Sequence, residues 1–136
     1  MKKILFLISL FCAVSLTAQN KADDVVGYFL STDPFTKELS QNYIYRAADG
    51  TYEAKVVWVQ NPKLKHHEGL VFMTNMTFNE KENEWQNAKM IYPGKSGKYK
   101  AYMSFTPDGK LKVRGYWGVS AFGKTLYWIR EAEMRK

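Results

Sequence analysis

The feature that most constrains the fold is a run of short segments and tight turns between Tyr92 and Arg130. Apolar and polar side chains alternate along residues 98–105 and 110–118, and glycine or proline stands at the turns between such segments. Alternation with a period of two is typical of β-strands that bury one face. The run therefore predicts three antiparallel strands and indicates which of their side chains face an interior.

The same alternation continues along the rest of the chain, and no stretch after residue 18 shows a helical period. The predicted strands are residues 25–30, 41–47, 51–60, 70–78, 84–92, 98–105, 110–118 and 124–133. Strands joined by short turns favour closure, because a closed barrel leaves no edge exposed. We predict an all-β protein with a single eight-stranded antiparallel up-and-down barrel, in which residues 32–39 form either a short helical turn or a flap over one end.

The first 18 residues have the pattern of a secretory signal peptide. Lys2 and Lys3 precede an apolar run at residues 4–14, which is too short to span a bilayer, and small residues precede Gln19. The less favoured alternative is a retained membrane anchor. We therefore expect an exported protein, periplasmic or extracellular, in which residues 19–136 form one barrel domain with its core at about 24–131. Next to the new N-terminus, Asp23 and Asp24 are expected to be flexible.

Removal of the signal peptide changes the composition that bears on function. Cys12 lies inside the apolar run, so the mature chain would lack cysteine and with it disulfides and cysteine-ligated metals. It would carry 18 basic and 13 acidic side chains, because the signal contains two lysines and no acid. The basic residues are scattered along the strands, which predicts a solvated outer face and argues against nucleic acid as a partner. The alternative is a weak attraction to anionic envelope surfaces.

The predicted inward faces are rich in aromatic side chains. The candidate interior residues are Tyr52, Trp58, Tyr99, Met103, Trp117 and Trp128. An eight-stranded barrel is just wide enough to be filled by side chains or to hold one small ligand. Two interpretations follow: the rings fill the barrel as core, or they line a pocket for a small apolar or amphipathic ligand.

Other chemistry is poorly supported by the sequence. His66, His67 and Glu68 form the only metal-like cluster, but adjacent histidines point in different directions and no third histidine exists. Both histidines lie in one predicted loop, so Ser96 and Ser104 have no identifiable base. We therefore predict no catalytic residue, no metal and no cofactor. The less favoured alternative to ligand binding is an enzyme with an unrecognised site. The main alternative is a filled barrel that docks to another envelope component through its outer face. The tyrosines proposed for that face are Tyr43, Tyr45, Tyr116 and Tyr127.

Two resemblances extend this interpretation. Gly27 and Phe29 near the start, with Arg130 near the end, resemble the Gly-x-Trp motif and closing arginine of lipocalin-like barrels, which implies an arginine over an aromatic ring at one barrel end.

From residue 24 to 130 the chain resembles the bacterial family of domain of unknown function 2147. The motifs that carry this resemblance are Val56-Val57-Trp58, Lys89-Met90-Ile91-Tyr92-Pro93, Ser96-Gly97-Lys98-Tyr99, Gly109 through Tyr116 and Trp128-Ile129-Arg130. The resemblance implies an exported lipocalin-like barrel and no particular activity. The chain departs from the family at Phe29, where tryptophan is usual, and in a shorter loop at residues 61–69.

Overall fold

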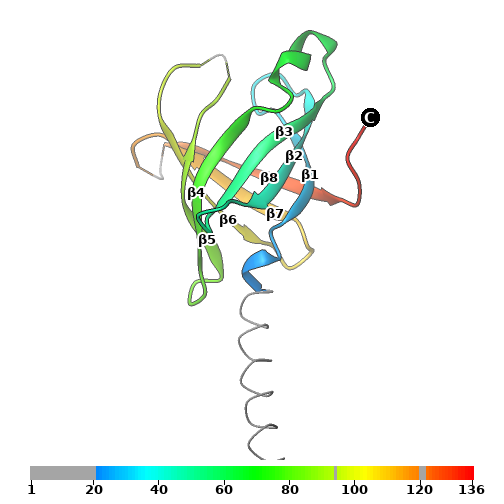
Figure 1. The fold of residues 1–136 in the computed structure, drawn as a ribbon. Coiled ribbons are helices and arrows are strands. Elements are labelled where there is room, and N and C mark those ends of the chain that lie inside the picture. Colours follow the sequence, from blue (N-terminus) through cyan, green and yellow to red (C-terminus); the bar gives the residue numbers. More distant parts are fainter. Residues whose placement is uncertain (1–20, 94, 120–121) are drawn as a thin grey trace, which may run out of the picture.

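The computed structural model describes residues 21–93, 95–119 and 122–136. The predicted signal peptide lies outside these residues. The strands are β1 (Gly27–Thr32), β2 (Leu39–Arg46), β3 (Tyr52–Val59), β4 (Val71–Asn79), β5 (Glu84–Met90), β6 (Tyr99–Phe105), β7 (Leu111–Tyr116) and β8 (Gly123–Glu131), with a 3₁₀ helix η1 (Pro62–His67). Each strand pairs antiparallel with the next, and β1 pairs with β8, so the sheet closes into a barrel (Figure 1). The predicted eight-stranded up-and-down barrel is therefore confirmed.

The two ends of the barrel differ in their connections. Tight turns at 47–51, 80–83 and 106–110 gather at one end, together with the start of the described chain, which we call the closed end. Longer loops, described at 33–38, 60–70, 91–93, 95–98, 117–119 and 122, gather at the other, which we call the open end (Figure 1). In the parts of the chain that the structure describes, no helix is both long and apolar enough to cross a membrane.

The interior of the closed half is filled by side chains. Trp85 is 2% exposed and contacts the rings of Phe78 and Phe105, with centroids 4.8 and 5.6 Å away. Tyr52 and Met103 are buried in the same core cluster. This half of the barrel agrees with the first interpretation of the aromatic residues, in which rings form the core.

The start of the described chain covers this filled half. Val25 is fully buried, and the Trp85 indole N–H donates to the carbonyl of Ala22 over 2.9 Å. The Tyr52 hydroxyl donates to the carboxylate of Asp23, and the carbonyl of Asp24 accepts a hydrogen bond from Arg130. The expectation that Asp23 and Asp24 are flexible was wrong, because this segment buries apolar surface and satisfies polar groups of the barrel.

Arg130 closes the barrel where β1 meets β8. Its guanidinium lies over the rings of Phe29 and Phe105, and its Nη1 donates to the carbonyl of Val26 over 3.0 Å. Gly27 has a φ of +147°, and a Cβ at this position would lie 2.6 Å from Arg130 Nη1. Glycine is thus required twice at position 27, by its backbone conformation and by the close approach of the guanidinium.

Bulges change which side chains face inward on several strands. On β3, Gln41 pairs with Trp58 while Asn42 pairs with Val56, so Val57 is an extra residue. The bulge turns Trp58 to the outer face, where the guanidinium of Arg135 lies 5.0 Å from its ring, and turns the buried Val59 inward. The prediction that Trp58 faces the interior was therefore wrong, because it assumed unbroken alternation.

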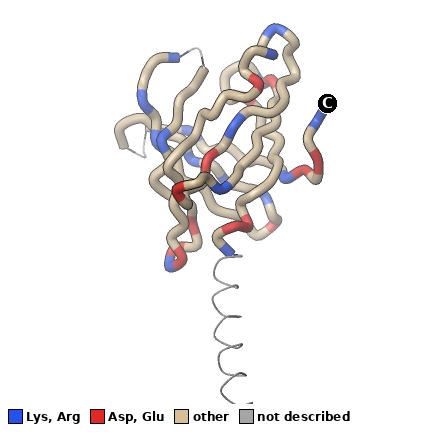
Figure 2. The backbone as a smooth tube through the Cα atoms, in the orientation of Figure 1, with Lys and Arg blue, Asp and Glu red and all other residues tan. Residues whose placement is uncertain are grey.

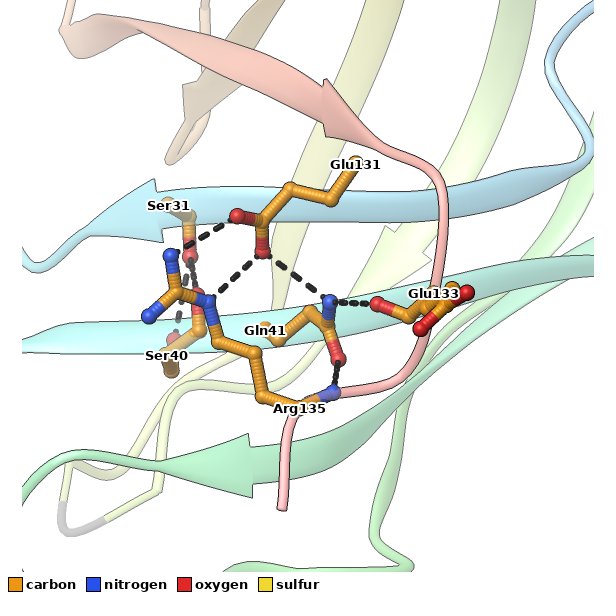
Figure 3. A network of polar contacts seen from close by, with 6 residues as sticks. All are labelled: Ser31, Ser40, Gln41, Glu131, Glu133 and Arg135. Carbon is orange, nitrogen blue, oxygen red and sulfur yellow. Dashed lines mark hydrogen bonds and ion pairs between the residues drawn. The ribbon is translucent and has the colours of Figure 1, made fainter.

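Beyond β8, the C-terminal segment folds back along the outside of the barrel (Figures 1 and 3). The fully buried Gln41 amide donates to the Glu131 carboxylate and to the carbonyl of Glu133, and accepts from the backbone N–H of Arg135. Arg135 in turn forms two hydrogen bonds with the Glu131 carboxylate. These contacts attach the last residues to β2.

Candidate ligand-binding cavity

The open half of the barrel contains a cavity of about 880 Å³. Its walls come from inward residues of the strands, among them Val56, Val113 and Leu126, and its mouth from loops of the open end. Such a volume lies within the range found for small-molecule sites. The barrel is therefore half filled and half hollow, so each interpretation of the aromatic interior holds for one half.

Trp128 is at the boundary between the two halves. Its ring lies 6.4 Å from that of Phe29 in the filled half and 6.2 Å from that of Phe72, which lines the cavity. The side chain is 3% exposed, and among the described residues no acceptor lies within hydrogen-bond distance of its Nε1. A buried donor without a partner is costly, because it has lost water and gained nothing in exchange. Trp128 thus separates the filled half from the cavity, and its indole N–H is buried without an acceptor among the described residues.

One wall of the cavity is polar. Asn42 is 3% exposed, and its Nδ2 donates to the hydroxyl of Ser31 over 3.1 Å. The hydroxyls of Ser31 and Ser40 lie 3.0 Å apart, and all three residues line the cavity (Figure 3 shows the two serines). The rest of the strand-derived wall is mostly apolar, so the polar groups form a narrow strip on β1 and β2.

The mouth combines aromatic and charged side chains. Phe35 and Tyr92 form an edge-to-face pair with centroids 5.5 Å apart, and the Nζ atoms of Lys95 and Lys124 lie 4.0 and 4.8 Å from the Phe35 centroid. Because Phe35 lies on the loop between β1 and β2, the predicted flap at 32–39 does lie at the mouth. These contacts join that loop to the loop before β6 and to the start of β8.

The Tyr92 hydroxyl also donates to the Asp33 carboxylate. Burial alone would raise the pKa of Asp33, but hydrogen bonds from Tyr92 and from the backbone N–H groups of Phe35 and Thr36 lower it below its usual value. Burial, the hydrogen bond to Asp33 and the negative charge of Asp33 raise the pKa of Tyr92. The pair is therefore a charged carboxylate held by a neutral phenol, which stabilises the loop over the mouth.

The structure separates the six residues that the sequence suggested as a lining. Tyr99, Trp117 and Trp128 line the cavity, although Trp117 does so at the mouth and is 64% exposed. Tyr52 and Met103 are not part of the cavity, because they lie in the filled half, and Trp58 faces outward. The sequence did not suggest Asn42, Ser31 or Phe35. Asn42 and Ser31 could have been noticed as polar residues at inward positions of their strands.

The other sequence candidates have simpler surroundings. Tyr43 and Tyr45 lie on the outer face, with the Lys55 ammonium 5.9 and 5.6 Å from their centroids. Gly115 faces the cavity, and its pairing with β6 and β8 is regular. The rings of His66 and His67 contact each other, and in the described ranges no three residues among histidine, cysteine and acids lie close enough to hold a metal.

Comparison with known proteins agrees with the fold. Protein HP1028 of Helicobacter pylori, whose structure is described as that of a member of the lipocalin family, superimposes with a TM-score of 0.66. The two chains are 16% identical, and the alignment covers 81% of this chain and 84% of the other. No curated protein matches the sequence significantly. The family model for uncharacterized proteins conserved in bacteria, DUF2147, matches residues 27–130, and the chain therefore belongs to this family.

Proposed function

We propose that the protein is a non-enzymatic carrier or sensor that binds one small, mostly apolar ligand in the open half of its barrel. The observation that carries this proposal is the cavity of about 880 Å³ with its mostly apolar walls. A filled structural barrel would need no such space, because empty apolar cavities destabilise a fold. The apolar walls favour an aliphatic or ring-containing body in the ligand.

The polar groups of the cavity restrict the ligand further. The strip of Ser31, Ser40 and Asn42 can bind a polar atom of the ligand along the wall, such as a carbonyl, ether or hydroxyl oxygen. The ligand class we propose is therefore an amphiphile with at least one oxygen that enters the barrel, and fatty acids and related envelope amphiphiles are the first candidates. The predicted signal peptide supports a further proposal, that binding takes place in the periplasm or outside the cell.

The experiment is a titration of the purified chain with an apolar fluorescent dye, followed by displacement with a panel of fatty acids, fatty alcohols and their methyl esters. We expect saturable binding with one site per chain and displacement by several members of the panel. The test variant is Leu126→Trp, which places a large ring in the cavity, and its control is Tyr127→Trp on the outer face of the same strand. Leu126→Trp should abolish binding and the control should retain it. If neither the dye nor any panel member binds, or if Leu126→Trp binds as well as the control, the proposal is wrong.

A further inference from the structure

Large apolar side chains are exposed around the mouth of the cavity. They come from three loops of the open end and are Phe35, Ile91, Trp117, Val119 and Phe122, each between 49% and 72% exposed. The loops follow one another around the barrel, because β1 pairs with β8 and the loop between β7 and β8 lies between the other two. Exposed apolar patches of this kind mark interaction sites in soluble proteins. We call these five residues the apolar rim.

Charge is distributed unevenly between the two ends of the barrel (Figure 2). The open end carries six lysines on its loops and at the start of β8: Lys37, Lys63, Lys65, Lys95, Lys98 and Lys124. Three acids lie on the same loops, namely Asp33, Glu38 and Glu68. Asp33 is engaged by Tyr92, and Glu68 forms an ion pair with Lys65 over 3.0 Å. The mouth is therefore positively charged as well as apolar.

The closed end has the opposite charge. Its turns and the start of the described chain carry six acids: Asp23, Asp24, Asp49, Glu80, Glu82 and Asp108. Three lysines accompany them, Lys21, Lys81 and Lys110, together with Arg46 and Arg130, which contact this segment at Asp23 and Asp24. The open end thus has six basic residues against three acids, whereas the closed end has five basic residues against six acids. This difference orients the molecule in the field of a negative surface, with its mouth toward that surface.

We propose that the open end docks on an anionic lipid bilayer. Aromatic side chains such as Trp117 and Phe122 are favourable at the boundary between headgroups and acyl chains, and lysines around them are attracted to anionic headgroups. A protein partner would need a matching acidic and concave surface, whereas a bilayer requires only exposed rings surrounded by cations. This inference goes beyond ligand binding and does not depend on it, although Trp117 and Phe122 also border the cavity. Docking in this orientation would place the mouth directly at the lipid surface.

The test is co-sedimentation of the full folded chain with vesicles of phosphatidylcholine alone and of phosphatidylcholine mixed with phosphatidylglycerol. We expect binding to the mixed vesicles that is at least about tenfold stronger than to the neutral ones and that weakens as salt is added. The apolar test variant replaces Trp117→Ser and Phe122→Ser together. Its matched control replaces Tyr127→Ser and Ile129→Ser, which are 53% and 52% exposed on the barrel wall. The charge variant is Lys37→Gln with Lys98→Gln, and its control is Lys55→Gln with Lys112→Gln on the outer face.

The apolar variant and the charge variant should each lose at least about tenfold in vesicle affinity. Their two outer-face controls should bind like the original chain. Unfolding curves of all four variants establish that each is folded. Absence of binding to mixed vesicles, or equal losses in rim and wall variants, would overturn the proposal. A concentration-dependent dimer that the Trp117→Ser and Phe122→Ser variant abolishes, without vesicle binding by the original chain, would also overturn it and assign the rim to self-association. The dye titration described above reports separately on the cavity.

Discussion

The guanidinium carbon of Arg130 lies 4.7 Å from the centroid of the Phe29 ring, across the pair of strands that closes the barrel. The same group donates hydrogen bonds to the carbonyls of Val26 and Asp24. It therefore joins the last strand both to the first strand and to the segment that covers the filled half.

Replacement of Arg130→Met should lower the free energy of unfolding by about 1–3 kcal/mol, because it removes the contact with Phe29 and leaves two carbonyls without their donor. Urea unfolding followed by circular dichroism measures this effect. The control is Lys112→Met, an exposed residue on the outer face of β7, which should change stability by less than about 0.5 kcal/mol. Equal effects of the two substitutions would show that Arg130 has no special role in closure.

Trp128 and Trp85 allow a matched comparison of two buried indoles. Both are almost fully buried, but Trp85 Nε1 donates to the Ala22 carbonyl over 2.9 Å, whereas Trp128 Nε1 has no acceptor among the described residues. Replacement by phenylalanine removes the same atoms at both positions. We expect Trp85→Phe to be less stable than Trp128→Phe by about 1–3 kcal/mol, because only the first leaves a carbonyl unpaired. Urea unfolding of the two variants gives the difference directly.

The same two substitutions should affect ligand affinity in the opposite order, so that Trp128→Phe has the larger effect. Trp128→Phe should weaken binding of an amphiphile, because it makes the ring that lines the cavity floor smaller. Trp85→Phe lies in the filled half and should leave affinity unchanged wherever the variant is folded. If Trp128→Phe binds as tightly as the original chain, the Trp128 ring is not part of the site.

The number and type of the strands could be predicted because alternation is a local property of the sequence. The strand predicted at 98–105 is observed at Tyr99–Phe105, and that predicted at 84–92 is observed at Glu84–Met90. Local alternation does not reveal bulges, since an extra residue is defined only by the partner strand. Trp58 was misplaced for this reason. On β4 and β5 the bulges contain Asn75 and Asn87, whose φ values of 67° and 66° suit asparagine better than most residues.

The division of the barrel into two halves could not be predicted, because inward positions near both ends carry large apolar residues. Met103 and Tyr99 lie on the same strand and face the same interior, yet one is in the core and the other lines the cavity. The difference arises from contacts that are distant in sequence. The segment around Val25 fills the closed end, whereas long loops leave the open end hollow.

Gln41 should be the residue that attaches the C-terminal segment to the barrel. Gln41→Ala should lower the free energy of unfolding by about 1–3 kcal/mol, since its buried amide makes three hydrogen bonds to residues 131–135. Deletion of residues 132–136 removes two of these partners and the contact of Arg135 with Trp58. In the shortened chain Gln41→Ala should therefore cost clearly less than in the full chain, as measured by urea unfolding in a double-mutant cycle. Additive costs would mean that the segment is not held through Gln41.

The contact between Tyr52 and Asp23 should be visible in the titration of tyrosine. Burial, followed by the hydrogen bond to Asp23 and the negative charge of that carboxylate, raises the pKa of Tyr52 to about 12, against 10.0 in the unfolded chain. A pKa that is raised in the folded state contributes stability that is full below pH 10 and is lost as the pH rises through about 12.

Replacement of Asp23→Asn removes the charge while burial remains, so the pKa of Tyr52 should fall toward 10. Tyrosinate absorbance of the folded protein measures the shift, and Asp24→Asn is the control, because Asp24 makes its contact with Arg130 through the backbone carbonyl. If Asp23→Asn and Asp24→Asn titrate alike, the carboxylate of Asp23 does not hold Tyr52, and the start of the described chain is held by the burial of Val25 and by the carbonyls of Ala22 and Asp24.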